Sequence, residues 1–177
     1  TLESMVWQAR AAGAYKISDM AYSLGKMFNI MVNKGHSMLA VEKELEHVKL
    51  YVHLQNNRYN DRFDLRIDLD DEELLQYRTL KLILQPILEN AINYGVSSMD
   101  DCGEIIVSGK RDNGNIILAV EDNGLGMSEE EAALVLTDSN RVHKKGSGVG
   151  LVNVNNRLKN LFGKEYGRKV GREADEG

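Results

Sequence analysis

The stretch LQPILENAINYG, residues 84–95, decides the fold of this chain. Its apolar residues follow alternating steps of three and one, which place them on one face of a helix. The spacing therefore predicts a helix over 84–95 whose apolar face belongs to the protein core. The residues on that face are Leu84, Ile87, Leu88, Ala91 and Ile92.

Three polar side chains interrupt this helix, although asparagine lowers helix propensity. Asn90 and Asn93 are three residues apart, and Glu89 and Asn93 are four apart, so their oxygens project from a neighbouring face. Such a cluster suits a bound cation. The alternative is an exposed helical face whose asparagines are merely solvated, and the helix alone does not decide between the two.

The composition is that of an ordinary soluble globular protein. The chain has 177 residues, of which 42% are hydrophobic and 28% charged. A net charge of -5 gives no basic surface for nucleic acid, so we expect no such partner. The lone Cys102 excludes an internal disulfide. No apolar run approaches the roughly 20 residues that span a bilayer, so we expect membrane attachment only through regions outside this sequence.

The chain divides near residue 60 into two parts of different periodicity. In residues 1–60 the apolar residues recur at helical spacing, with breaks expected at Gly13 and over 33–35 and a third helix over 41–57. From Phe63 onward they alternate with polar residues up to Leu69, as in a half-buried strand. The first part is therefore predicted to be helical, and the second to begin with a strand.

The remainder of residues 61–177 predicts alternating strands and helices. Strands are expected over 104–110 and 115–121 around a turn at 112–114, which makes a hairpin, and helices over 129–136 and 149–162. A hairpin with helices on one face is typical of a two-layer α/β (α+β) sandwich. The sequence therefore predicts a helical segment over 1–60 followed by an α/β domain over 61–177.

The sequence EDNGLGM, residues 121–127, follows directly after a predicted strand. Gly124 and Gly126 at alternate positions allow the backbone to approach a flat ligand closely, because no side chain stands in the way. Asp122 can accept a hydrogen bond from an exocyclic amine. The alternative is an ordinary turn, because Asp-Asn-Gly is also a strong turn signal.

The sequence KKGSGVGLVNVNNRL, residues 144–158, places Gly146, Gly148 and Gly150 directly before a predicted helix. Such a loop presents free backbone N–H groups and the positive end of the helix dipole, which suit a phosphate. GxGxG alone is a weak signal. A Rossmann dinucleotide site requires a strand directly before the glycines, whereas the preceding TDSNRVHKK is loop-like.

The order of these motifs closely resembles the ATP-binding domain of the gyrase, Hsp90, histidine kinase and MutL superfamily, with its Bergerat fold. Residues 89–93 match its N box, 122–126 its G1 box and 146–151 its G2 box. Within this superfamily the chain is most similar to bacterial sensor histidine kinases of the LytS/YesM type. LQPILENAINYG resembles their LQPLVENAIKHG, GSGVGLVNVNNRL their GIGLxNVxxRL, and KELEHVKLYVHLQNNRYNDRF their EELxxVxxYLxIQxxRFxxRF.

The resemblance implies that ATP and Mg²⁺ bind, and that the γ-phosphoryl group passes to a histidine and then to an aspartate of a response regulator. Asn90 would be the Mg²⁺ ligand, Asp122 would recognise adenine, and Glu89 would orient or deprotonate the acceptor imidazole. Residues 128–145, with Arg141 and His143, would form a lid over the nucleotide. The implied nucleotide contacts are Asn90, Asn93, Asp122, Gly124, Gly126, Lys144, Lys145, Gly146, Gly148, Gly150 and Leu151.

The resemblance also implies features of the full-length protein. We expect a homodimer in which residues 1–60 belong to the dimerisation and phosphoacceptor region, in the cytoplasmic portion of a bacterial membrane sensor kinase. The acceptor histidine is expected just before Thr1, so this fragment would not phosphorylate itself. After Gly167 the family's closing strand is not recognisable, which suggests truncation or loss of that strand.

Two alternatives to kinase activity remain at the level of sequence. ATPases of this superfamily activate water with a carboxylate four residues before the Mg²⁺ asparagine, but Pro86 occupies that position. Asn93 and Tyr94 replace the usual Lys and His of the N box, which leaves open a pseudokinase or dimeric interaction module.

Overall fold

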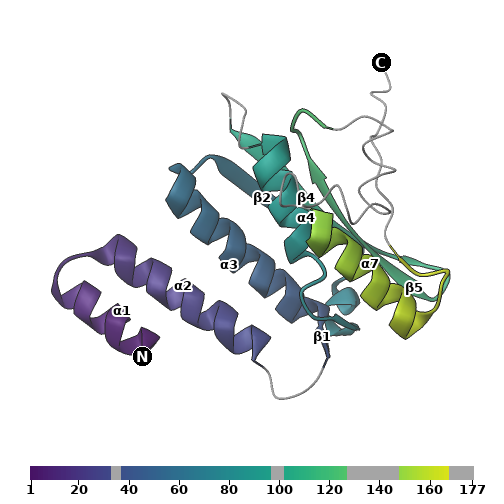
Figure 1. Ribbon diagram of the computed structural model, residues 1–177, viewed down its shortest axis with the longest axis horizontal. Helices are drawn as coiled ribbons and strands as arrows, with labels where there is room; N and C mark the ends of the chain where they lie inside the picture. Colours follow the sequence, from purple (N-terminus) through teal and green to yellow (C-terminus); the bar gives the residue numbers. More distant parts are fainter. Residues whose placement is uncertain (33–36, 97–101, 127–147, 168–177) are drawn as a thin grey trace.

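The computed structural model describes residues 1–32, 37–96, 102–126 and 148–167. The chain begins with two helices, α1 (Leu2–Ala11) and α2 (Tyr15–Met31), which form a hairpin beside the rest of the molecule (Figure 1). The predicted break at Gly13 is confirmed: its φ of 72° lies in the left-handed region that glycine adopts without strain. The predicted break over 33–35 lies outside the described residues.

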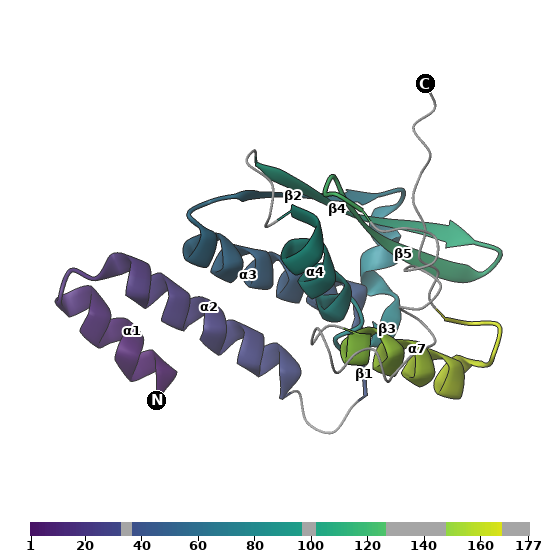
Figure 2. The same cartoon turned by 45° about the horizontal axis from the view of Figure 1, so that its top comes forward.

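Helix α3 (Val41–Tyr59) confirms the third predicted helix and lies between the hairpin and the sheet (Figures 1 and 2). It ends at Asn60, whose left-handed conformation stops the helix. The Asn56 side chain then donates to the Phe63 carbonyl at 2.7 Å and accepts from the Phe63 N–H at 2.9 Å. These two bonds fix where the next strand begins.

The main sheet has the strand order β2–β4–β5. Strand β2 (Phe63–Leu69) runs parallel to β4 (Gly103–Asp112), and β4 pairs antiparallel with β5 (Asn115–Asp122). Asn113 and Gly114 both have positive φ values, of 48° and 82°, as the tight two-residue hairpin turn requires. The predicted period-two strand and the predicted hairpin are both confirmed.

A second, two-stranded sheet was not predicted. Strands β1 (Met38–Ala40) and β3 (Arg78–Leu80) pair antiparallel, and the short helix η1 (Glu72–Gln76) precedes β3. Strands of three residues are too short to leave a recognisable alternation in the sequence. This small sheet attaches the start of α3 to the segment that leads into the LQPILENAINYG helix.

That helix is not regular along its whole length. Residues Gln85–Asn90 form the α-helix α4, and Ala91–Val96 continue it as the π-helix η2. Leu84, Leu88, Ala91 and Ile92 are buried, so the predicted apolar face is confirmed. The sequence pattern predicted one continuous helix, because a π-helical turn has no periodic signature of its own. Such turns are frequent at functional sites.

Helices α3, α4 and α7 (Gly148–Phe162) lie on one face of the main sheet (Figure 2). The mixed α/β fold predicted from sequence is confirmed. The division at residue 60 stays a prediction, and the predicted helix over 129–136 lies outside the described residues. One core joins the helices and the sheet, with buried residues Met27, Val41, Leu45, Val48, Tyr51, Val52, Phe63, Leu80, Ile83, Leu84, Leu88, Ile92, Ile105, Val107 and Val154.

Candidate functional site

The structure brings together the elements that carry the three sequence motifs. The π-helix η2 contacts β4 and β5, and α4 contacts α7. The closeness of α4 and α7 is visible at Gly150, where an added Cβ atom would lie 3.1 Å from the Cβ of Pro86. Segments far apart in the sequence therefore meet around α4 and η2, at one place beside the sheet (Figures 1 and 2).

Glu89 and Asn90 form the last turn of α4, and both side chains are partly buried. The Gln85 side-chain amide, one turn earlier, donates to Glu89 Oε1 at 2.8 Å and so holds the carboxylate in place. Tyr51 of α3 is also close: burial, followed by the negative charge of Glu89, raises the pKa of Tyr51 to about 12. Glu89 thus accepts a hydrogen bond from one amide and acts electrostatically on a phenol that stays neutral.

Asn93 lies in the π-helical segment and its side chain is exposed. In an α-helix, residues three apart lie on one face. The i→i+5 bonding of a π-helix gives this segment a wider turn than the regular helix that the sequence pattern predicted. The cluster of three polar side chains stays a prediction.

Asp122 is the last residue of β5, and its carboxylate accepts the Gly124 N–H at 3.0 Å through Oδ1. Burial raises the pKa of Asp122, while the bond from Gly124 acts against that rise. The neighbouring Asn123 closes the end of the sheet, since its Oδ1 accepts the Glu104 N–H at 2.8 Å. The other carboxylate oxygen, Oδ2, is also a hydrogen-bond acceptor.

The glycines of the two motifs serve different local needs. Gly126 has a φ of 68°, which explains why glycine stands there. Gly148 begins α7, and Gly150 lies against Pro86. Leu151 is buried. The remaining predicted contacts, Lys144, Lys145 and Gly146, lie outside the described residues, as do Arg141, His143 and the predicted lid.

The donors around α4 fit a metal ion that a substrate helps to hold. Among the described residues, no group of three His, Cys, Asp or Glu side chains could hold a metal ion. Asn90, the predicted metal ligand, offers one amide oxygen. Mg²⁺ usually takes one or two protein ligands together with phosphate oxygens and water. This donor set therefore fits Mg²⁺ bound with a nucleotide.

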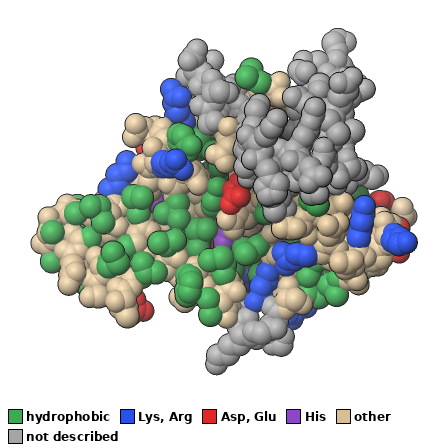
Figure 3. Space-filling view, viewed as in Figure 1, with side chains coloured by type: hydrophobic (Ala, Val, Ile, Leu, Met, Phe, Trp, Pro, Cys, Tyr) green, Lys and Arg blue, Asp and Glu red, His purple; other side chains and the backbone are tan. Residues whose placement is uncertain are grey.

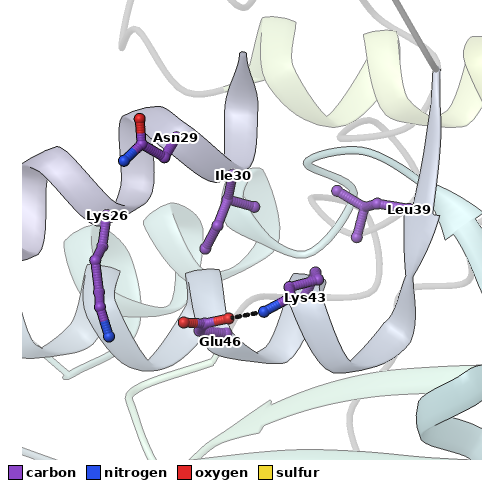
Figure 4. A pocket seen from close by; sticks show the side chains of 6 residues that line it. All are labelled: Lys26, Asn29, Ile30, Leu39, Lys43 and Glu46. Carbon is purple, nitrogen blue, oxygen red and sulfur yellow. Dashed lines mark hydrogen bonds and ion pairs between the residues drawn. The ribbon is translucent and has the colours of Figure 1, made fainter. Parts of the chain in front are cut away.

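A cavity of about 290 Å³ lies away from this site, between α2, β1 and α3 (Figure 4). Lys43 and Glu46 line it and pair with each other at 2.7 Å. Lys26, Asn29, Ile30 and Leu39 complete the lining. The Lys43–Glu46 pair neutralises two of the charges in this lining, and we assign the cavity no role.

Sequence reasoning missed Glu44, a carboxylate on α3 that is only 1% exposed. Its oxygens accept the Leu82 N–H at 3.0 Å and the Leu84 N–H at 2.9 Å, directly before α4. Burial raises the pKa of Glu44, and the backbone hydrogen bonds it accepts act in the opposite direction. A glutamate in the first turn of a helix is common on exposed surfaces, so the sequence carried no signal of this role.

Two family models match the chain. Residues 76–176 match the family of histidine kinase-, DNA gyrase B- and HSP90-like ATPases, and residues 1–63 match the histidine kinase family. The first match covers the three motifs. It also supports ATP binding by this domain, since ATP is the ligand that its family description implies.

Curated relatives agree with this result. The chain is 32% identical to the sensor histidine kinase YesM of Bacillus subtilis over 177 residues, which cover 100% of the chain and 29% of that protein. It is 30% identical to the sensor histidine kinase BtsS of Escherichia coli over 158 residues, or 89% of the chain and 26% of that protein. It is 32% identical to the sensor histidine kinase/phosphatase LytS of Staphylococcus aureus over 155 residues, or 84% of the chain and 26% of that protein. The chain thus spans less than a third of each relative, and it belongs to the sensor histidine kinases of the LytS/YesM type, with a histidine kinase region followed by the ATPase domain.

Proposed function

We propose that this chain binds Mg·ATP between α4, the end of β5 and the start of α7, and transfers the γ-phosphoryl group to a histidine. The observation that supports the proposal is that η2, which continues α4, contacts β5 and that α4 contacts α7, in a domain of the matched ATPase family. A phosphoryl transfer needs positioning and charge neutralisation more than covalent participation by the protein. A site assembled from several rigid elements suits that need.

Asp122 would recognise the adenine ring. Its Oδ1 is already held by the Gly124 N–H, so the carboxylate is oriented before any ligand arrives. Oδ2 would then accept a hydrogen bond from the exocyclic amine of adenine. Gly124 and Gly126 leave room for the flat ring, because neither carries a side chain.

Asn90 would give its side-chain oxygen to Mg²⁺, and backbone N–H groups at the start of α7 would bind phosphate oxygens. The magnesium ion, when bound, neutralises charge on the β- and γ-phosphates. The backbone N–H groups of Gly146 and Gly148 in the G2 box would also bind phosphate oxygens. Lys144 and Lys145 would add positive charge there. Asn93 would reach the nucleotide from the exposed side of η2, while Gly150 and Leu151 would support the loop by packing.

Glu89 would act on the acceptor histidine. In the transfer, the bond between the γ-phosphorus and the β,γ-bridging oxygen breaks, an imidazole nitrogen forms a new bond to phosphorus, and ADP leaves. Glu89 would orient the imidazole and accept its N–H proton. The Gln85 amide that donates to Glu89 Oε1 would keep the carboxylate in one rotamer for this purpose.

Two partners are proposed: a response regulator, from family membership, and a second copy of the chain, from the apolar surface of α1 and α2. A sensor histidine kinase implies a response regulator that receives the phosphoryl group on an aspartate. A second copy of the chain would cover the apolar side chains exposed on α1 and α2, which gather on the left of Figure 3. The larger of these are Met5, Trp7, Tyr15, Ile17, Met20, Tyr22, Leu24 and Phe28.

We propose the cytoplasmic side of a bacterial membrane for this part of the kinase, since ATP and response regulators are found there. Within the described residues, no helix has the length and apolar character needed to cross a bilayer.

Two alternatives make different predictions. A nucleotide hydrolase would need a base in place of Pro86, whose side chain has no proton acceptor and packs against Gly150. An interaction module would bind nucleotide without transferring phosphate. The altered N box, with Asn93 and Tyr94, is the feature that favours this second alternative.

Nucleotide binding is tested by titrating the chain with a fluorescent ATP analogue in the presence of Mg²⁺. We expect Asp122→Asn to abolish binding, because an amide has only one acceptor oxygen. If that oxygen accepts from Gly124, the NH₂ group faces the adenine amine; if it faces the adenine amine, the Gly124 bond is lost. Asp64→Asn, an exposed aspartate in β2, is the matched control and should bind as the wild type does. Unchanged affinity of Asp122→Asn would show that the adenine assignment is wrong.

Phosphoryl transfer is tested by mixing the chain with Mg·[γ-³²P]ATP and a longer polypeptide that carries the family's acceptor-histidine helix. We expect label on protein that is stable to base and lost in acid, as phosphohistidine is. Nucleotide binding without labelling would favour the interaction module. Steady release of inorganic phosphate without labelling would favour the hydrolase.

A further inference from the structure

The four residues 81–84, which we call the α4 lead-in, join β3 to α4. Leu82 within it has a φ of 57°, a left-handed conformation that is uncommon for residues other than glycine. A strained backbone persists only where its surroundings hold it. The lead-in therefore needs contacts that fix its shape, and these contacts also set where α4 begins.

Glu44 supplies the first contact, from α3. One carboxylate oxygen accepts the N–H of Leu82 and the other accepts the N–H of Leu84. A carboxylate that is 1% exposed is stabilised only when several donors surround it. The two backbone N–H groups are such donors, and their hydrogen bonds fix Leu82 and Leu84 relative to Glu44 on α3.

Arg157 supplies the second contact, from α7. Its guanidinium Nη2 donates to the Lys81 carbonyl at 2.9 Å, although the side chain is otherwise exposed. Its charge also favours the ionised form of Glu44, whose pKa burial raises. The lead-in is thus held from two sides, by α3 and by α7, which begins within the G2 box.

The backbone around the start of α3 also forms hydrogen bonds with the α4 lead-in and with the residues just before β3. Lys81 N–H donates to the Ser37 carbonyl at 3.0 Å, and Val41 N–H donates to the Tyr77 carbonyl at 2.8 Å. The Lys81 ammonium lies 3.5 Å from the Met31 carbonyl at the end of α2. The end of α2, the start of α3 and the lead-in are therefore linked at one junction.

We propose that Glu44 and Arg157 are positioning residues for the nucleotide site. They fix the α4 lead-in, and through it the orientation of Glu89 and Asn90 at the far end of the six-residue helix α4. A displacement of α3 would reach Asn90 through Glu44 without any contact between α3 and the nucleotide. This inference rests on the proposed function, because it assigns a role to residues outside the ATP-binding motifs.

The test measures the affinity of the full chain for Mg·ATP by calorimetry at 15 °C, after circular dichroism has shown that each variant is folded. In Glu44→Gln the side-chain NH₂ group faces one of the two backbone N–H groups, so one bond is lost. We expect the Kd to rise about tenfold. Arg157→Met, which is on the surface, should fold and raise the Kd about threefold. Glu46→Gln is the matched control on the same helix and should change it less than about twofold.

A second measurement separates positioning from a general loss of stability. Without nucleotide, the side-chain amide signals of Asn90 in the ¹H–¹⁵N NMR spectrum should shift in Glu44→Gln and Arg157→Met, and stay in place in Glu46→Gln. Wild-type affinity in Glu44→Gln would overturn the proposal. If that variant does not fold, wild-type affinity and an unshifted Asn90 signal in Arg157→Met would overturn it. A wild-type chain that does not bind Mg·ATP would instead overturn the proposed function, and this inference with it.

Discussion

His47 should make the stability of this protein depend on pH in the range where histidine titrates. The side chain is 1% exposed, and within the described residues its Nε2 has no hydrogen-bond partner. Burial lowers the pKa of His47 below its ordinary value of 6.5, because a charged ring there would lose its hydration. The unfolded chain therefore binds a proton at a higher pH than the folded chain does.

The sign of the effect follows from this difference in pKa. The stability is fully present above pH 6.5, and it is lost as the pH falls below 6.5 toward the lower pKa of the folded state. One proton changes the free energy of unfolding by at most about 1.4 kcal/mol per pH unit. The loss between pH 7.5 and 5.5 should total at most about 1.4 kcal/mol, the limit for a His47 that stays neutral in the folded chain.

The assay is urea unfolding, followed by circular dichroism at pH 7.5, 6.5 and 5.5, for the wild type and His47→Leu. The variant has no imidazole to protonate, so the wild type should lose stability relative to it as the pH falls. Comparing the two chains removes the contributions of carboxylates and of other histidines. Parallel pH profiles for the two chains would refute the reasoning.

Two further predictions concern packing and assembly. Gly150→Val should lower the free energy of unfolding by about 1–3 kcal/mol, since even one Cβ atom would lie 3.1 Å from the Cβ of Pro86. Thermal unfolding measures this change. An unchanged melting temperature would contradict the close packing of α4 on α7. Ile17→Asp, at a side chain that is 62% exposed on α2, should leave the fold intact and weaken self-association. Light scattering over a range of concentrations measures that effect, and dimers of unchanged stability would exclude this face as the interface.

The elements that sequence predicted well are those with a long regular pattern. The alternation from Phe63 to Leu69 continues over the whole of β2, and Asn113 and Gly114 adopt the positive φ values that their turn requires. Helix α3 ends beyond the predicted residue 57, at Tyr59, because the left-handed Asn60 rather than the apolar pattern stops it. Periodicity thus identified the element, and local backbone chemistry set its end.

The elements that sequence did not predict depend on contacts between distant residues. The π-helical turn after Asn90 lies inside a pattern that predicts one regular helix, because such a turn has no periodic signature of its own. Glu44 acquires its role only because two backbone amides of the α4 lead-in lie beside it. The N-box and G1-box residues were predicted from their motifs, whereas no motif predicted the contacts that Glu44 and Arg157 make with the α4 lead-in.

The parallel pairing of β2 with β4 has a consequence for how the protein folds. Parallel strands cannot be joined by a tight turn, and here the connection between them includes β3, α4 and η2. Closing so long a connection is entropically unfavourable until both strands are in place, so this step should come late. Glu89 and Asn90 belong to that connection, because they form the last turn of α4. A chain emerging from the ribosome should therefore acquire affinity for nucleotide only after β4 has been synthesised and has joined β2, which makes ligand binding a report on completed folding.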